Sequence, residues 1–419
     1  WDNYISVSPK VAKDNNLTLG SMVEVSVNGR TLKLPTVVQP GTLDTAIAVE
    51  LGYRRTKIGA VGENVGFNAN KFQNSKDGFS KWIYTGATIK ATGENYELAT
   101  TQEHHDIDDQ FLLHDQPTGM EDGVLQTEKK QFQDVRGIIK EATVDEYKHD
   151  PEIIHHHKHS VFSITENFEY NDVKWAMAID QNKCMGCNAC VTACNVENNV
   201  PVVGKHEVLR GREMQWMRID RYYDGTPEEP QTSMQPMLCQ HCDNAPCENV
   251  CPVVATTHSP DGLNQMIYNR CVGTRYCANN CPYKVRRYNF YDFREKLAEG
   301  YYLAESFKYM HNPEVTVRSR GVMEKCDFCI ERIMEERQIA TEKGETFDGS
   351  TVVSACQEAC PTSAIYFGNA NDPKSDVAKL RKHNLGYGVL DFLNVIPNVT
   401  YLARLKNKTE GSNHHKEVN

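Results

Sequence analysis

The residues of this chain best suited to chemistry are its fifteen cysteines, which occur at regular spacings in four runs. In the third run, threonine stands where the spacing asks for a second cysteine. The runs are Cys184, Cys187, Cys190, Cys194; Cys239, Cys242, Cys247, Cys251; Cys271, Thr274, Cys277, Cys281; and Cys326, Cys329, Cys356, Cys360. Thiolate is a soft ligand that iron in a cubane prefers, so these runs predict iron sites.

The spacing within the runs indicates iron–sulfur clusters. Two-residue gaps allow one tight loop to present three thiolates to three corners of a cubane, while the last cysteine of the run ligates the other cluster of a pair. This is the ligand pattern of ferredoxins, used four times. It predicts a row of four clusters, three of them [4Fe–4S], in a protein that transfers electrons and has no acid–base or nucleophilic catalytic residues of its own.

Thr274 leaves two interpretations of the third run open. Its hydroxyl could complete a cubane, or it could mark an empty corner and leave a [3Fe–4S] cluster. A neutral hydroxyl is a poor iron ligand beside thiolates, which favours the three-iron cluster.

Two other uses of cysteine fit the pattern less well. Disulfides would pair the cysteines, but fifteen is an odd number and dense C-x2-C pairs suit metal sites better. Structural zinc uses C-x2-C knuckles, yet these runs place three thiolates closer together than a knuckle needs. A zinc-binding interaction module therefore remains only as the alternative of another class.

Several stretches of the second half resemble the four-cluster subunits that serve molybdopterin oxidoreductases such as polysulfide, dimethyl sulfoxide and nitrate reductases. The resemblance is closer still to the iron–sulfur subunit of bacterial alternative complex III. The stretches are Trp175–Asp180, Asn198–Gly204, Gly211–Asp220, Cys271–Asn289 and Gly321–Ile330. This resemblance implies a quinol oxidoreductase that passes electrons toward haem c subunits, a cytochrome c or a terminal oxidase.

The two-pair plan of these relatives implies which cysteines share a cluster, because it pairs the first run with the fourth and the second with the third. We call the resulting groups sets 1 to 4. Set 1 is Cys184, Cys187, Cys190, Cys360; set 2 is Cys326, Cys329, Cys356, Cys194; set 3 is Cys239, Cys242, Cys247, Cys281; set 4 is Cys271, Cys277, Cys251, with Thr274 at the vacant position. Sets 1 to 3 would hold [4Fe–4S] clusters and set 4 the [3Fe–4S] cluster.

Residues 1–95 contain no cysteine and predict a separate β domain. Val23–Val27 and Arg30–Leu34 alternate around Asn28-Gly29, the signature of a hairpin with a type I′ turn. Short β runs are also expected at Thr36–Gln39 and Ala46–Glu50. The region resembles the C-terminal β-barrel of molybdopterin-dinucleotide enzymes, which implies a scaffold without molybdenum cofactor and an incomplete piece of a longer polypeptide.

The remaining boundaries follow from composition. Residues 96–170 are expected to be a polar linker, in which the histidines of 155–159 are interpreted as solvated rather than as a metal site. Residues 171–375 are expected to be a doubled ferredoxin-like domain, with a helix at Phe328–Ala340. Residues 376–419 are expected to be a tail that docks on a partner or packs on the cluster domain, with a short helix at Val377–Lys382.

Charge and hydropathy restrict the partners. A formal net charge of −10 argues against nucleic acid, and no apolar run approaches the ~18 residues of a membrane span. The basic stretch of Lys284, Arg286 and Arg287 could dock a partner, stay solvated, or donate hydrogen bonds to nearby sulfurs.

The family resemblance implies a peripheral protein on the periplasmic side of the bacterial inner membrane. An integral quinol-binding subunit of the polysulfide-reductase anchor type would hold it, with multihaem and monohaem cytochrome c subunits as further partners. Electrons would enter at the three-iron cluster, although their direction cannot be read from the sequence. The same clusters would equally serve a relay to a true molybdopterin reductase, with the opposite electron flow.

Overall fold

The computed structural model describes residues 1–59, 61–76, 79–80, 82–102, 120–121, 124–125, 138–156, 163, 166, 168–225, 230–293 and 309–407. The chain divides into two compact units. Unit 1 contains residues 1–132, 203–211 and 223–232, and unit 2 contains residues 133–202, 212–222 and 233–419. All fifteen cysteines therefore belong to unit 2.

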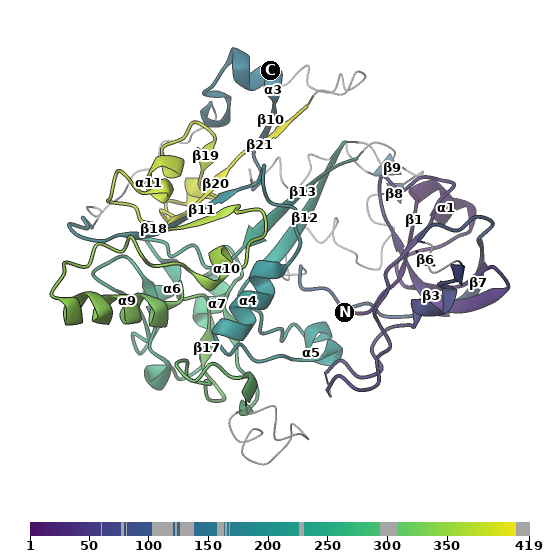
Figure 1. Ribbon diagram of the computed structural model, residues 1–419, viewed down its shortest axis with the longest axis horizontal. Coiled ribbons are helices and arrows are strands. Elements are labelled where there is room, and N and C mark those ends of the chain that lie inside the picture. Colours follow the sequence, from purple (N-terminus) through teal and green to yellow (C-terminus); the bar gives the residue numbers. More distant parts are fainter. Residues whose placement is uncertain are drawn as a thin grey trace. The chain divides into compact units, whose positions relative to one another are not determined.

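Unit 1 is built on a five-stranded sheet with the order β4-β1-β3-β2-β7 (Figure 1). The hairpin expectation is confirmed, because β2 and β3 pair antiparallel and both turn residues, Asn28 and Gly29, have positive φ. The run at 36–39 is not a separate strand but the end of β3. The strands are β1 (Ile5–Val7), β2 (Ser21–Val27), β3 (Arg30–Val38), β4 (Ala48–Val49) and β7 (Thr88–Asn95).

The apolar side chains of this sheet form a core of their own. Ile5, Val23 and Leu34 are fully buried in it, and α1 (Pro9–Asp14) contributes Ala12. Ser8 caps α1 by accepting a hydrogen bond from the Val11 N–H at 3.1 Å. The β character expected for this region is thus confirmed. The closure of its strands into a barrel stays a prediction.

The smaller elements of unit 1 are short. They are η1 (Ala69–Phe72), β5 (Ser75–Lys76), β6 (Phe79–Ser80), β8 (Met120–Glu121), β9 (Val124–Leu125) and α5 (Lys205–Leu209).

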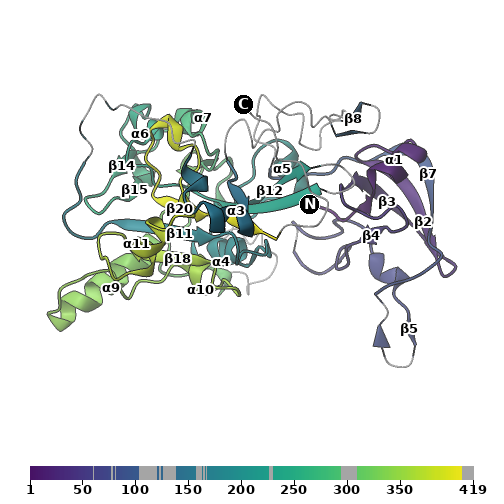
Figure 2. The same ribbon diagram turned by 90° about the horizontal axis from the view of Figure 1, so that it is seen from above.

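Unit 2 is organised by a four-stranded sheet with the order β18-β11-β20-β19, which Figure 2 shows together with α11. The central strand β11 (Trp175–Asp180) pairs antiparallel with β18 (Ile365–Asn369) and parallel with β20 (Val399–Leu402). β19 (Gly386–Tyr387) extends the sheet beyond β20. Strand β11 is buried on both faces, as expected for a central strand.

The two faces of β11 differ in side-chain size, and this difference positions the cysteine loops. The small residues Ala176 and Ala178 pack against Val377 of α11 (Asp376–Arg381). On the opposite face, Trp175 stacks on Phe367 with ring centroids 5.1 Å apart. Phe367 in turn contacts Phe328, which lies between the first two cysteines of the fourth run. The bulky face of the sheet therefore supports a cysteine loop directly.

The described part of the C-terminal region packs on unit 2, because β19 and β20 join this sheet and α11 packs against it. Of the two interpretations of residues 376–419, packing on the cluster domain is the one found for β19 and β20. β21 (Arg404–Lys406) pairs with β10 (Glu141–Thr143), so the region expected to be a linker also contributes a strand. After β10 the chain continues into α3 (Val144–His149) and η3 (Ile153–His155). Thr143 and Glu146 form a capping box at the N-terminus of α3. His157 and His159 lie outside the described residues.

Short helices and hairpins surround the sheet of unit 2. The helix expected at 328–340 is found as α9 (Ile330–Lys343), ended by Gly344 in a left-handed conformation. Among the described residues, no helix combines the length and apolar character needed to cross a bilayer. The other elements are α4 (Ala189–Glu197), α6 (Pro246–Asn249), α7 (Tyr276–Asn280), α10 (Ala355–Glu358), η4 (Tyr268–Arg270), η6 (Asp391–Leu393) and the two-stranded sheets β12 (Arg218–Gly225) with β13 (Pro230–Met237), β14 (Thr256–His258) with β15 (Asn264–Met266), and β16 (Arg287–Tyr288) with β17 (Met323–Glu324).

Candidate iron–sulfur cluster sites

All fifteen cysteines are free thiols, and all but one are at least partly buried. The exception is Cys187, which is exposed. Ten thiols lie in loops near the helices α4, α6, α7, α9 and α10. Five lie within helices: Cys190, Cys194, Cys247, Cys277 and Cys356. A loop followed at once by a helix turn holds several thiols at one place without a long element between them.

Set 1 brings together cysteines from opposite ends of unit 2. Burial raises the pKa of Cys184, and the neighbouring thiols of Cys360 and Cys187 raise it further. Burial likewise raises the pKa of Cys190 to about 12, with contributions from Cys356, Cys184 and Cys360. Helix α4, which follows the first loop, packs against α10, which carries Cys356 and is followed by Cys360 (Figure 1).

Set 2 is the reciprocal group, and it takes Cys194 from α4 and Cys356 from α10. Burial raises the pKa of Cys194 well above its ordinary value, and Cys329 and Cys356 add to the shift. The pKa of Cys326 is also raised by burial and then by Cys194. The last cysteine of the first run therefore lies with the fourth run.

Set 3 gathers the second run around the last cysteine of the third. Burial raises the pKa of Cys242 well above its ordinary value, and Cys239, Cys281 and Cys247 raise it further. Burial also raises the pKa of Cys247 to about 12, against the opposing charge of Arg286. The helices α6 and α7, which carry Cys247 and Cys277, pack against each other.

Set 4 contains three thiols. Burial raises the pKa of Cys277, Arg286 lowers it, and the neighbouring thiols of Cys271 and Cys251 raise it. These contacts bring together thiols within each set, and some also join neighbouring sets, such as Cys190 with Cys356. The assignment of each cysteine to a set stays a prediction from the resemblance. The binding of a cluster to each set remains a proposal.

The loop around Thr274 has the backbone of a cysteine loop. In the first run, Gly186 and Asn188 flank Cys187 with φ values of +68° and +63°. In the third run, Gly273 and Arg275 flank Thr274 with φ values of +71° and +62°. Asn188 and Arg275 are also the N-caps of α4 and α7, and Cys187 and Thr274 are both exposed. Thr274 therefore occupies the position of the second cysteine, with its loop geometry unchanged.

Gly273 provides a test of this geometry. A Cβ at position 273 would lie 2.4 Å from the Gly321 carbonyl oxygen, and its φ of +71° disfavours any other residue. We expect Gly273→Ala to displace the loop and to lower the iron content of the protein by the cluster of set 4. The matched control is Gly344→Ala, with a φ of +67° and open space around its Cβ, which should cost about 1 kcal/mol and no iron. Equal iron contents in the two variants would contradict this account.

The loops after Cys251 and Cys360 are also repeated. The N–H of Ala255 donates to Cys251 Sγ at 3.1 Å, and the N–H of Ala364 donates to Cys360 Sγ at 3.2 Å. Burial alone would raise the pKa of both thiols. Hydrogen bonds from backbone N–H groups outweigh the effect of burial and lower both pKa values. These repeats show that unit 2 contains two halves of the same design, one with sets 1 and 2 and one with sets 3 and 4.

The four sets follow one another in a row. Sets 1 and 2 adjoin through Cys190 and Cys356. Sets 2 and 3 adjoin through Cys326 and Cys239. Between these two, His241 of the second run stacks on Phe328 of the fourth, with ring centroids 3.8 Å apart and planes inclined by 18°. Sets 3 and 4 adjoin at Arg286, which faces thiols of both.

The donor sets suit iron–sulfur clusters. Several buried thiols in one place cannot ionise without a nearby positive charge, which is why burial raises the pKa values of Cys190, Cys194 and Cys242. Bound iron supplies that charge and keeps a coordinating thiol deprotonated. Among the described residues, no three Cys, His, Asp or Glu side chains converge on one metal ion. A cubane does not require such convergence, because each thiolate binds a different iron.

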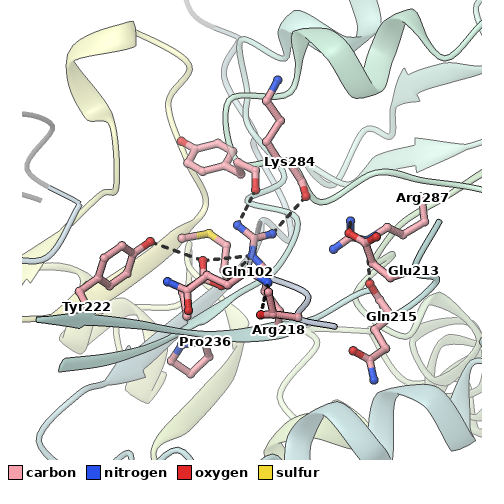
Figure 3. A network of polar contacts seen from close by, with 12 residues as sticks. Gln102, Glu213, Gln215, Arg218, Tyr222, Pro236, Lys284 and Arg287 are labelled. Carbon is pink, nitrogen blue, oxygen red and sulfur yellow. Dashed lines mark hydrogen bonds and ion pairs between the residues drawn. The ribbon is translucent and has the colours of Figure 1, made fainter. Parts of the chain in front are cut away.

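The basic stretch at 284–287 is mostly internal. Arg286 and Arg287 are only 5% and 8% exposed. The interpretation that these two side chains dock a partner or stay solvated is therefore wrong, because water and partners cannot reach them. Arg287 Nη1 pairs with Glu213 Oε1 at 2.5 Å, and the guanidinium of Arg218 donates to the carbonyl oxygens of Tyr283 and Lys284 (Figure 3). This network holds the segment that follows Cys281. The third interpretation, hydrogen bonding to sulfur, agrees with the contact of Arg286 and Cys277.

Two features of the site were missed from the sequence. Lys325 is completely buried and donates from Nζ to the carbonyl oxygen of Cys326 at 2.7 Å. The His241–Phe328 stack was also not expected. Both lie next to cysteines of the second and fourth runs. The burial of Lys325 and the stacking of His241 on Phe328 depend on tertiary packing, which no local signal in the sequence states.

The cysteine-containing part of this chain is similar to known iron–sulfur proteins. Two family models, both described as 4Fe-4S dicluster domain, match residues 183–255 and 230–295. The iron-sulfur cluster-binding subunit of menaquinone reductase from Nitratidesulfovibrio vulgaris is 37% identical over 245 residues, 57% of this chain and 92% of the relative.

Two further relatives come from archaea. Iron-sulfur subunit 1 of the Hdr-like menaquinol oxidoreductase from Archaeoglobus fulgidus is 37% identical over 54% of this chain and 82% of its own length. The iron-sulfur subunit of a putative dimethyl sulfoxide reductase from Halobacterium salinarum is 33% identical over 54% of this chain and 78% of its own length.

Proposed function

The chain belongs to the family of iron–sulfur subunits of quinone-linked and molybdopterin-type oxidoreductases, and from this premise we propose that it relays single electrons in a quinol-oxidising complex of the alternative complex III type. The observation that supports the relay is the row of four cysteine sets, in which each set adjoins the next. A row of this kind would allow an electron to pass from each set to the next.

In this proposal, sets 1, 2 and 3 each hold a [4Fe–4S] cluster and set 4 holds a [3Fe–4S] cluster. When bound, the clusters supply one-electron carriers whose potentials depend on net charge, hydrogen bonds to sulfur and exposure. The protein contributes the last two of these properties. The N–H groups of Ala255 and Ala364 donate to Cys251 and Cys360 at the two outer sets, and packing buries the inner sets.

The specific type of complex rests on the sequence resemblance. We propose that unit 1 is a scaffold derived from the molybdopterin-dinucleotide-binding β-barrel and that it binds no molybdenum cofactor. The partners would be an integral quinol-binding subunit of the polysulfide-reductase anchor type and cytochrome c subunits. The proposed location is the periplasmic side of the inner membrane, where quinol at the set 4 end would deliver electrons to the row.

A relay to a molybdopterin reductase is the second candidate. The similarity to the iron-sulfur subunit of a putative dimethyl sulfoxide reductase favours it, because that relative serves a reductase according to its name. Elemental analysis of the intact complex separates the two: stoichiometric molybdenum supports the reductase, and its absence together with haem c supports the quinol oxidoreductase.

Electron paramagnetic resonance of the purified complex tests the relay itself. We expect a nearly isotropic three-iron signal in the oxidised protein, replaced on dithionite reduction by interacting [4Fe–4S] signals. Four reducible cubanes without the three-iron signal would contradict the assignment of set 4. A colourless protein without acid-labile sulfide would point instead to the zinc-binding module.

A further inference from the structure

Arg286 is a buried arginine whose hydrogen-bond acceptors are neutral. Its Nη1 donates to Thr256 Oγ1 at 3.1 Å, and its Nη2 donates to Asn264 Oδ1 at 2.9 Å. The side chain is 5% exposed. Thr256 and Asn264 belong to the facing strands β14 and β15, so the hairpin fixes the guanidinium from two sides.

No carboxylate pairs with this guanidinium among the ion pairs of the described residues. Its neighbours show the usual alternative, since Arg287 pairs with Glu213 and Arg218 with Asp220. A buried positive charge without a counter-charge is strongly unfavourable. Arg286 therefore needs a negative charge that comes from another kind of group.

Two contacts place Arg286 beside thiols of two sets. Asn264, which accepts from Arg286, also contacts Cys247 Sγ of set 3 through its Nδ2 at 3.8 Å. Ala255, which precedes Thr256 in the chain, donates its N–H to Cys251 Sγ of set 4 at 3.1 Å. Clusters bound at these two sets would supply the negative charge. Arg286 thus lies where it acts on two adjacent sets at once.

The other half of unit 2 has different charged neighbours. Near set 2 the charged side chains form pairs: Glu197 pairs with Arg332 at 2.6 Å, and Asp327 lies 4.0 Å from Arg318. The two halves repeat the same loops but not the same charges, so the row is electrostatically asymmetric.

We propose that Arg286 is a positioning residue that raises the reduction potentials of the clusters at sets 3 and 4 together and so makes this end of the row the preferred location of the electron. The inference rests on the proposed function, since it requires clusters at these sets. Reduction adds one negative charge to a cluster. A fixed cation in a buried medium stabilises that added charge far more than it would in water.

Redox titration followed by electron paramagnetic resonance tests the proposal. In Arg286→Gln, we expect the reduced-to-oxidised ratio of both clusters at a fixed potential to fall about tenfold, which is about 59 mV for one electron. The clusters of sets 1 and 2 in the same protein should keep their potentials and serve as the internal control. Arg286→Lys keeps the charge and should stay within about threefold of the unsubstituted protein.

A second pair of variants covers the case in which Arg286→Gln fails to load its clusters. Met266 is partly exposed, and its Sδ lies 3.7 Å from Arg286 Nη1. Met266→Glu places a carboxylate beside the guanidinium and should lower the same two potentials, whereas Met266→Gln should not.

Three results would overturn the inference. The first is intact clusters with unshifted potentials in Arg286→Gln. The second is an equal fall in Arg286→Gln and Arg286→Lys, which would mean that geometry rather than charge is responsible. The third is equal potentials in Met266→Glu and Met266→Gln where Arg286→Gln cannot be measured. If the unsubstituted protein itself lacks clusters by iron and sulfide analysis, the proposed function fails first, and this inference fails with it.

Discussion

Thr274→Cys is expected to replace the three-iron signal by that of a fourth reducible cubane, with iron rising from about 15 to about 16 per chain. The loop already has the required backbone, because Gly273 and Arg275 repeat the conformations of Gly186 and Asn188. A thiol at position 274 would therefore stand where Cys187 stands in the first run. Spectroscopy of the oxidised protein and its iron-to-protein ratio are the two measurements.

Thr274→Ala is the matched control for this substitution. If position 274 leaves an empty corner, removal of the hydroxyl should change neither the iron content nor the oxidised signal. If the hydroxyl completes a cubane, Thr274→Ala should lose an iron, and this would refute the three-iron assignment. An unchanged signal in Thr274→Cys, with no extra iron, would mean that the loop cannot present a fourth ligand.

Removal of iron by a chelator under reducing conditions is expected to unfold unit 2 and to leave unit 1 folded. The interior of unit 2 around the sets is lined by buried thiols such as Cys190, Cys242 and Cys356. Clusters bound to them, as proposed, would link segments that lie far apart in the chain. Binding free energy at such sites is folding free energy, so its loss exceeds the ~5–15 kcal/mol by which typical domains are stable.

Hydrogen exchange of the iron-free protein checks this prediction by region. Amides of β11 and β18 in unit 2 should lose their protection. Amides of β2 and β3 in unit 1 should keep theirs, because the core around Val23 and Leu34 contains no cysteine. Retained protection in β11 after complete iron removal would show that the sheet of unit 2 is stable by itself.

The sequence predicted local structure well where a local signal exists. The Asn28-Gly29 hairpin, α9 and α11 all lie within a few residues of their expected positions, because turn residues and helical periodicity act over short distances. The membership of the sets came from a resemblance rather than from spacing, since no local signal states that Cys360 lies beside Cys184.

The parts that could not be predicted depend on contacts distant in the sequence. The stretch at 385–405 is ambiguous in the sequence because its apolar residues suit a partner surface as well as a strand, and only the pairing of β20 with β11 decides between them. In the sequence, Arg286 is one of a short basic run. Its burial depends on the β14–β15 hairpin, which precedes it by some twenty residues and has no signal that points to an arginine.

The crossing of the sets also determines the order in which the protein can be completed on the ribosome. Sets 3 and 4 use residues 239–281, whereas sets 1 and 2 enclose them and require Cys356 and Cys360. The proposed ligands of sets 3 and 4 are therefore all synthesised before Cys356 and Cys360, which complete sets 1 and 2. Strand β11 also lacks its partners at that stage, because both β18 and β20 follow residue 364. A nascent chain thus exposes unpaired thiols and an unpaired apolar strand until residues 356–402 have been made, so this topology favours insertion of the outer clusters after that point.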